Sequence, residues 1–310
     1  MLAAINQSKR DRHLLLKCLF VFALSTIILT ILYLFSIQTD NTWENRITIF
    51  RNNQNELGLK IAISILILIT IMHDNRLKFK KNRYLFYVII LAMLIFMIQT
   101  GSRVAFISLF LSLITYFFLR GKNFTLNNLY KLLPVSIIFL FIWQFFLVNT
   151  LLIKRIFMTV NEGDISGRDI RWVASLDLIS KNPLFGQGET GYARSIVPIL
   201  DYYSSPHNVM IEILCYTGIV GLIIFLIFLT RTIICGINSY KVDKDIFPVT
   251  LLIPIFGMIL SGQIIGTKIA WVIFTFIIAL PVSKSFNNRL KRRKERILIN
   301  NNHETLNGEF

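Results

Sequence analysis

The sequence predicts an all-α, polytopic transmembrane helical bundle of about eight spans with a large, mostly helical extracytoplasmic loop. Three observations lead to this fold class. Hydrophobic residues make up 54% of the 310 residues, and 26 residues are Phe, which is typical of a membrane protein. Apolar segments long enough to cross a bilayer recur along the chain. One polar stretch, residues 150–207, is too long to be a simple connection between two helices.

The apolar segments divide the chain into four parts. Residues 1–149 form an N-terminal transmembrane region of about five spans, and residues 208–283 form a C-terminal one of about three. The 150–207 loop separates them, and a basic cytoplasmic tail, residues 284–310, is expected to be disordered. The second and third spans are shorter than the ~20 residues that a bilayer requires. The predicted spans lie near residues 14–37, 58–72, 84–99, 101–119, 132–149, 208–230, 247–263 and 266–283.

The distribution of basic residues predicts the orientation of the spans. The formal net charge is +16, but most of it is topological. One set of alternate connections carries 21 Lys and Arg, and the opposite set carries 10. Because cytoplasmic connections are richer in basic residues, both termini are predicted to be cytoplasmic and the 150–207 loop external. The charge is therefore poor support for a nucleic-acid partner.

The sequence predicts neither cleavage of its N-terminal segment nor cysteine chemistry. Lys9, Arg10 and Arg12 precede an apolar run as in a signal peptide, but no small-residue cleavage site follows, so the first span is expected to be retained. Two of the three cysteines lie in predicted spans and the third at a cytoplasmic helix end, which predicts neither a disulfide framework nor a metal cluster. No cofactor and no metal are expected.

Arg103 is the first candidate for chemistry. It lies in Thr100-Gly101-Ser102-Arg103, at the external junction between the third and fourth predicted spans. An arginine at the membrane face is costly unless it is functional or reaches the interface, and its planar fork suits two phosphate oxygens. A snorkelling interfacial arginine is the alternative.

The 150–207 loop gathers six basic residues, a histidine and several tyrosines, an inventory that suits an anionic, sugar-bearing lipid. Ser166 and Asp169 fit a capping box, which predicts a helix from there to about Ser180. Arg168 and Arg171 would share one face of this helix. Such a helix is expected on the outer membrane surface, with Ile170, Val173 and Leu178 buried elsewhere. The alternative is that the arginines only meet lipid headgroups.

The next part of the loop is less specific. Gly186-Gln187-Gly188 and Gly191 permit a tight turn or a close backbone approach to a ligand, and the plainer interpretation is that they redirect the chain. Tyr192, Tyr202 and Tyr203 could stack on sugar rings, although tyrosines also populate membrane interfaces.

His207 is the sharpest single candidate. Ser205 suits the N-cap of the following helix and Pro206 its first position, which predicts His207 in the first turn. The positive helix end disfavours imidazolium, so a neutral, base-competent imidazole is expected. The alternative is a histidine that only satisfies the helix terminus. One turn deeper, Glu212 is predicted to be an intramembrane carboxylate that Lys268 could pair with, either functionally or as a structural pair.

Taken together, these segments resemble the O-antigen ligase and O-antigen polymerase family of bacterial membrane proteins. The resemblance covers roughly Asn52 to Pro281. Its most specific parts are R-x2-R-W-x8-K-N-P-L-F-G-Q-G, beginning at Arg168, and S-P-H-N-x3-E-x5-G-x2-G, beginning at Ser205. TGSR at a membrane boundary also matches, and Asn52–Gly58 ahead of a span matches more loosely.

The resemblance implies a metal-independent glycosyltransferase of the bacterial cytoplasmic (inner) membrane. Its donor would be an undecaprenyl-diphosphate-linked glycan, and its acceptor a glycan or a lipid-anchored chain. It would act in surface polysaccharide biosynthesis beside other polysaccharide-assembly proteins. By resemblance, His207 serves in catalysis, Arg103, Arg168 and Arg171 bind the diphosphate, and Glu212 and Lys268 support the site.

Three alternatives stay open at this point. Polymerase and ligase differ only in the acceptor, and nothing in the sequence separates them. A transporter of lipid-linked oligosaccharides is the rival from another class, although the internal repeats typical of transporters are missing from the sequence. An inactive, truncated family member is the third, because the family usually has ten or more spans.

Overall fold

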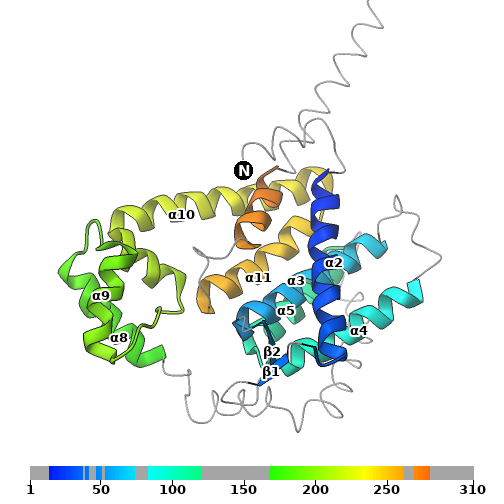
Figure 1. Cartoon of the computed structure of the whole chain (residues 1–310). Coiled ribbons are helices and arrows are strands. Elements are labelled where there is room, and N and C mark those ends of the chain that lie inside the picture. Colours follow the sequence, from blue (N-terminus) through cyan, green and yellow to red (C-terminus); the bar gives the residue numbers. More distant parts are fainter. Residues whose placement is uncertain are drawn as a thin grey trace, which may run out of the picture.

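The computed structural model describes residues 14–37, 39–41, 47–50, 53–73, 83–120, 168–261 and 269–279. The predicted span at 132–149, the tail at 284–310, Lys268 and both termini lie outside the described residues. Figure 1 shows two groups of helices joined by one long helix, α10. The larger group contains α2 (Leu14–Leu34), α3 (Gln54–His73), α4 (Arg83–Gln99), α5 (Arg103–Arg120) and α11 (Phe247–Ser261). The smaller group contains α8 (Arg168–Lys181), α9 (Gly188–Leu200) and the first turns of α10 (Val209–Asp243).

The helices of the larger group enclose the main apolar core. α3 lies at its centre, and its face from Leu57 to Met72 is almost entirely buried. Asn53 caps α3 through its side-chain oxygen, which accepts from the backbone N–H groups of Asn55 and Glu56. This cap explains why the helix begins four residues before the predicted span at residue 58.

A short antiparallel hairpin precedes α3 and was not predicted. β1 (Thr39–Asn41) pairs with β2 (Ile47–Ile49). With three residues in each strand it is a minor addition to a chain whose described elements are otherwise helical. Ile49 is buried in the main core, so β2 packs against that core.

Small residues bring the helices of the larger group close together. A side chain at Gly58 of α3 would collide with Ser102, which directly precedes α5, and with Ala105 in α5. At the other side of α5, the Ser112 hydroxyl donates to the backbone oxygen of Thr250 in α11 at 3.2 Å. Close backbone approach at small residues is the usual packing of helices in membranes.

The span prediction is confirmed only in part. Four described helices are long and apolar enough to cross a membrane by length and composition: Lys17–Leu34, Gln54–Met72, Arg103–Arg120 and Val209–Val242. Shorter apolar helices occupy Tyr84–Gln99, Phe247–Leu260 and Ile269–Ala279. Apolar side chains such as Val21, Leu24 and Ile224 are exposed on these helices, as expected where lipid replaces water.

Helix α10 departs most from its predicted span at 208–230. It continues to Asp243 and ends at Lys244, which has a left-handed backbone. The N–H of Lys244 donates to the Tyr240 oxygen, and the N–H of Asp245 donates to the Ser239 oxygen. It also contains a kink at Gly218, which has φ 65° and ψ −163°. The kink divides the helix into a short arm, Val209–Thr217, and a long arm, Ile219–Asp243. At 1.5 Å per residue the long arm alone is long enough to cross the ~30 Å hydrocarbon core.

Candidate functional site

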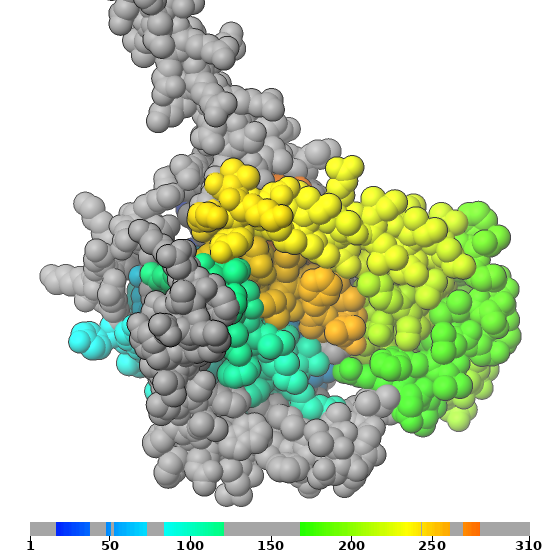
Figure 2. Space-filling model, turned by 180° about the vertical axis from the view of Figure 1, so that it is seen from behind, coloured from blue at the N-terminus to red at the C-terminus, as the bar shows by residue number. Residues whose placement is uncertain are grey.

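The short arm of α10 packs with α8 and α9 into a compact unit, called here the α8–α9 unit. Its own core consists of Ala174, Leu178, Tyr192, Ile196, Cys215 and Tyr216. In Figure 2 this unit, in green, forms one end of the molecule beside the yellow α10. The predicted helical character of the 150–207 loop is thus confirmed for its described residues, although α9 itself was not predicted.

Tyr192 is the structural centre of this unit. It is fully buried, its hydroxyl donates to the backbone oxygen of Ser204 at 3.0 Å, and it lies 3.2 Å from the Ser175 hydroxyl. Burial raises the pKa of Tyr192 to about 12, so the phenol keeps its proton. Tyr192 therefore joins α8 and α9 to the loop before α10, and neither sugar stacking nor membrane anchoring describes it. Tyr202 and Tyr203, in contrast, are exposed.

The glycine-rich turn binds the kink of α10 by its backbone. The N–H of Gln187 donates to the Cys215 oxygen at 3.0 Å, and the N–H of Ile219 donates to the Pro183 oxygen at 2.9 Å. An unbroken helix would join Cys215 and Ile219 to each other. The 183–187 loop thus takes up the hydrogen bonds that the kink releases, as buried backbone groups require.

Glycine is needed on both sides of this contact. A side chain at Gly218 would collide with the backbone of Leu184 and Phe185, and one at Gly186 with the backbone of Cys215, Tyr216 and Thr217. Both glycines have a φ of 65°, which other residues rarely adopt. The close backbone approach considered for this motif is present, but its partner is the helix of the same chain and not a ligand.

Helix α8 carries the two loop arginines. It begins at Arg168, close to the predicted start, while the capping residue Ser166 lies outside the described residues. Leu178 is buried as predicted, but Ile170 and Val173 are exposed by 62% and 69%. Their burial was wrong because the opposite face of α8 packs on α9 and α10. The exposed apolar face fits a helix that lies against lipid.

The predicted geometry at the start of α10 was also wrong. Asn208, not Ser205, is the N-cap, and its side-chain oxygen accepts from the N–H groups of Met210 and Ile211. His207 lies one residue before the cap with a left-handed φ of 51°. Its N–H donates to the Ser205 hydroxyl at 3.3 Å. The alternative that His207 serves as the helix cap is therefore excluded by the Asn208 side chain.

His207, Arg168 and Arg171 come together in the structure. Trp172 of α8 donates its indole N–H to the Pro206 oxygen at 2.9 Å, which fixes the histidine loop on α8. Burial, Arg171 and Arg168, in that order, lower the pKa of His207 to about 4. The imidazole is thus neutral at neutral pH, as expected, but burial and arginines are the causes instead of the helix end.

Arg171 contributes an unsatisfied donor to this group. Its Nε atom is buried and has no hydrogen-bond partner among the described residues. A buried guanidinium donor without a partner is costly, and an anion would satisfy it. Arg168 and Arg171 therefore form a cationic face beside a neutral histidine.

Arg103 belongs to the other group of helices. It is the first residue of α5, after a turn in which Gly101 has φ 62° and the Ser102 hydroxyl accepts from the N–H of Ala105 at 3.4 Å. A cation at the positive end of a helix is unfavourable, and a bound anion would reverse this effect. α5 packs against α3 and α11, whereas α8 packs against α9 and α10.

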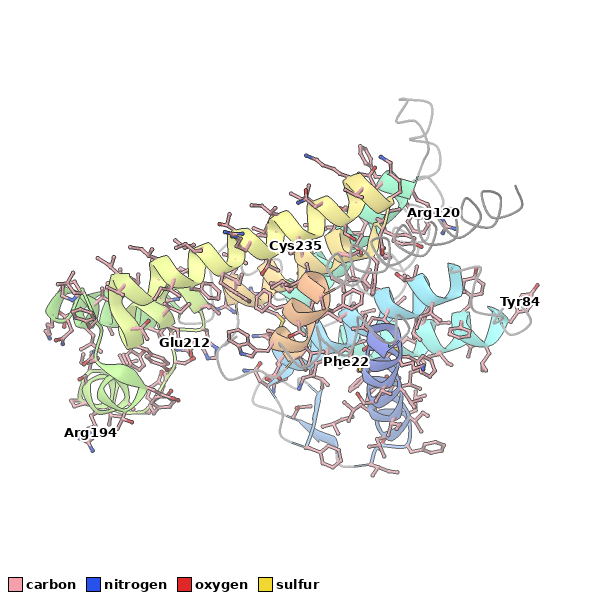
Figure 3. All side chains as sticks on the ribbon, turned by 90° about the horizontal axis from the view of Figure 1, so that it is seen from above. Phe22, Tyr84, Arg120, Arg194, Glu212 and Cys235 are labelled. Carbon is pink, nitrogen blue, oxygen red and sulfur yellow. The ribbon has the colours of Figure 1, made fainter. Side chains whose placement is uncertain are left out.

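Glu212 lies in the short arm of α10 (Figure 3) and is only 4% exposed. Glu189 is its electrostatic neighbour and the Tyr216 hydroxyl its hydrogen-bond partner, and Lys268, its suggested partner, lies outside the described residues. The surroundings of Glu212 in the α8–α9 unit were missed by sequence reasoning, because Glu189 and Tyr216 belong to no motif. The Asn208 cap had a signal, since asparagine directly before an apolar run is a favoured cap.

Comparison with known families gives one match. Residues 86–226 match the family model described as O-Antigen ligase. The matched range runs from α4 into the long arm of α10 and contains Arg103, Arg168, Arg171, His207 and Glu212. No curated protein matches the chain.

Proposed function

Because residues 86–226 make the chain a member of the O-antigen ligase family, we propose that this integral membrane protein is a metal-independent glycosyltransferase. It transfers or polymerises a glycan from an undecaprenyl-diphosphate-linked donor at the outer face of the bacterial cytoplasmic membrane. The acceptor is a second glycan or a lipid-anchored chain. Both termini are cytoplasmic, and the α8–α9 unit is external.

The observation that carries this proposal is the neutral His207 held beside Arg168 and Arg171. The three side chains interact electrostatically, and the bond from Trp172 to Pro206 at 2.9 Å keeps them together. A base next to two cations is what transfer from a diphosphate-linked donor requires. The base takes a proton from the acceptor, and the cations stabilise the leaving group.

The proposed step is a single displacement at the anomeric carbon. The acceptor hydroxyl oxygen forms the new bond to that carbon while its proton passes to His207. The bond from the anomeric carbon to the diphosphate oxygen breaks, and undecaprenyl diphosphate leaves with its electron pair. A single attack inverts the configuration at this carbon.

Donor binding would also prepare the base. Arg171 and Arg168 contribute to the low pKa of His207, and a diphosphate bound to them would offset their charge. The pKa of His207 would then rise towards the working pH, where a general base is most effective. The histidine would thus become a better base only when the donor is in place.

Other parts of the structure support the same assignment. The buried, unpaired Nε of Arg171 offers a donor to a phosphate oxygen. The position of Arg103 at the positive end of α5 favours an anion there as well. The exposed Ile170 and Val173 can rest on the lipid in which the donor is dissolved.

The test uses His207→Asn, because asparagine tolerates a left-handed backbone and cannot act as a base. We expect the rate of glycan transfer to fall at least about a hundredfold in this variant, which is the usual contribution of a general base. Donor should still bind and should accumulate in the membrane. Glycan product formed from purified donor and acceptor is the measurement, and normal product from His207→Asn would remove His207 from the mechanism.

Two further outcomes separate other roles. If His207 held the diphosphate as a cation, donor binding would weaken in His207→Asn, and His207→Arg would partly restore it. If the chain were a transporter, donor would cross the bilayer of reconstituted vesicles without any new glycosidic bond. Either result would contradict the proposed base.

A further inference from the structure

The α8–α9 unit has a second group of polar side chains that the proposed transfer step does not use. Glu212 has Glu189 as its electrostatic neighbour and Tyr216 as a hydrogen-bond partner, whereas the electrostatic neighbours of His207 are Arg171 and Arg168. The two sets share no residue. The unit therefore carries an acidic group of side chains as well as the cationic one.

Glu212 is the buried member of this group. Its side chain is 4% exposed, and its Oε2 atom has no hydrogen-bond partner among the described residues. A buried carboxylate oxygen without a partner is costly. It calls for a donor that the described part of the chain does not supply.

Gln187 supplies the complementary feature. Its backbone N–H is bonded to the Cys215 oxygen at 3.0 Å, which holds it beside the short arm of α10. Its Oε1 accepts from the Ser195 hydroxyl at 3.0 Å, while its Nε2 is buried and unpaired. Glu212 on α10 thus has a buried acceptor without a partner among the described residues. Gln187, whose backbone is bonded to α10, has a buried donor without a partner among them.

A hydroxyl group can satisfy both atoms at once, since it donates one hydrogen bond and accepts others. The acidic group also reaches the surface of the unit, because Glu189 and Tyr203 are exposed and Tyr203 interacts with Tyr216. An exposed tyrosine ring offers an apolar face to a sugar ring. The neighbouring acidic side chains of Glu189 and Glu212, on the other hand, disfavour phosphate and any acidic sugar.

We propose that Gln187, Glu189, Tyr203, Glu212 and Tyr216 form a sugar subsite for a neutral sugar residue of the glycan. In this subsite a sugar hydroxyl donates to Glu212 Oε2 and accepts from Gln187 Nε2. The inference rests on the proposed function, and it adds that the glycan next to the transfer centre is neutral and not acidic. Glu212 is thus a specificity-determining residue, and the diphosphate is bound by the separate group of Arg168 and Arg171.

The experiment measures two kinds of binding to the full-length protein in lipid nanodiscs. The sugar probes are the methyl glycosides of glucose, galactose, mannose and N-acetylglucosamine, with methyl glucuronide as the acidic counterpart. Undecaprenyl diphosphate without sugar is the probe for the cationic group of Arg168 and Arg171. We expect saturable binding of at least one neutral glycoside and none of the glucuronide.

The substitution Glu212→Gln should weaken binding of the neutral glycoside about tenfold to a hundredfold, the usual effect of losing a charged hydrogen-bond partner, and leave undecaprenyl diphosphate binding unchanged. Asp177→Asn is the matched control, because Asp177 is exposed and pairs only with Lys181 at 2.8 Å among described residues. It should bind both probes as the original chain does. If Glu212→Gln does not fold, Gln187→Met decides by the same criteria.

Three results would overturn the subsite: no saturable binding of any neutral glycoside, equal binding of the glucuronide, or unchanged glycoside binding in Glu212→Gln. A water molecule that merely fills the gap would give the first or third result. Failure of the proposed function would look different. In that case the original chain would not bind undecaprenyl diphosphate, or Arg171→Ala would bind it as well.

Discussion

At the scale of single residues, the backbone of His207 shows how the site is held. A left-handed φ of 51° is uncommon for a histidine and costs of the order of 1 kcal/mol. The cost is offset by the bond from its N–H to Ser205 and by the bond from Trp172 to Pro206. The strain places the imidazole against two arginines, where an ordinary helical first turn would not hold it.

The lowered pKa of His207 predicts a dependence of stability on pH. The folded value of about 4 lies below the ordinary value of 6.5, so between them the unfolded chain binds the proton and the folded chain does not. Stability is therefore full above pH 6.5 and falls as the pH drops towards about 4, by roughly 3 kcal/mol in total. Thermal unfolding in detergent across this range is the measurement. His207→Asn should be less sensitive to acid, and an identical acid response in both proteins would contradict this.

The substitution Arg103→Lys separates charge from geometry at the start of α5. Lysine keeps the cation but loses the planar fork that binds two phosphate oxygens. We expect glycan product to fall about tenfold to a hundredfold, because a charged hydrogen bond is worth about 1.5–3 kcal/mol. Membrane insertion should be unchanged. Full transfer activity in Arg103→Lys would mean that this residue only anchors the helix.

At the scale of elements, the joint between the 183–187 loop and α10 determines where the short arm points. Two interchanged backbone bonds, Gln187 to Cys215 and Ile219 to Pro183, stabilise a bend that an isolated helix would not keep. The bend allows one helix to serve two environments. Its long arm is apolar and reaches the main core, while its short arm belongs to the α8–α9 unit.

A comparison of two glycine-to-alanine substitutions tests the contact between the 183–187 loop and α10. Gly218→Ala places a methyl group against the backbone of Leu184 and forces alanine into a conformation that glycine alone adopts readily. We therefore expect the free energy of unfolding to fall by about 3–5 kcal/mol. Gly188 has a similar φ of 69° but nothing within 4 Å of a new side chain, so Gly188→Ala should cost only about 1–2 kcal/mol. Thermal unfolding compares them, and equal losses would show that the contact with the 183–187 loop is unimportant.

At the scale of the whole molecule, α10 connects the two groups of helices (Figure 1) and relates the candidate site to the bilayer. If its long arm crosses the membrane, the α8–α9 unit and Lys244 are on opposite sides. Together with the count of 21 against 10 basic residues in alternate connections, this predicts that the unit is outside.

Labelling of introduced cysteines tests this orientation. Asp177→Cys, in the exposed part of α8, should react with a membrane-impermeant maleimide in intact cells. Lys244→Cys, at the far end of α10, should react only after the cells are opened. The signal of the original chain, which has Cys18, Cys215 and Cys235, is subtracted as background. Labelling of Lys244→Cys but not Asp177→Cys in intact cells would reject the proposed function, because the site would face the cytoplasm.

The sequence alone determined the features that depend on local pattern and composition. Apolar runs marked most of the described helices, since a bilayer demands about 20 apolar residues whatever their neighbours. The motif residues of the loop predicted a resemblance to the O-antigen ligase family, and residues 86–226 match the model of that family. The sequence did not predict the short hairpin or the polar first turn of α3. Their stability comes from the buried Ile49 and the Asn53 cap and not from a periodic pattern.

Only the tertiary structure decided how the loop motifs meet. The position of the His207 loop on α8 and the kink at Gly218 depend on contacts between residues 28 to 40 positions apart in the sequence. No local propensity encodes such contacts. The sequence therefore named His207, Arg168 and Arg171 as candidates, whereas packing of α8 and α9 on α10 brought them together and lowered the pKa of the histidine.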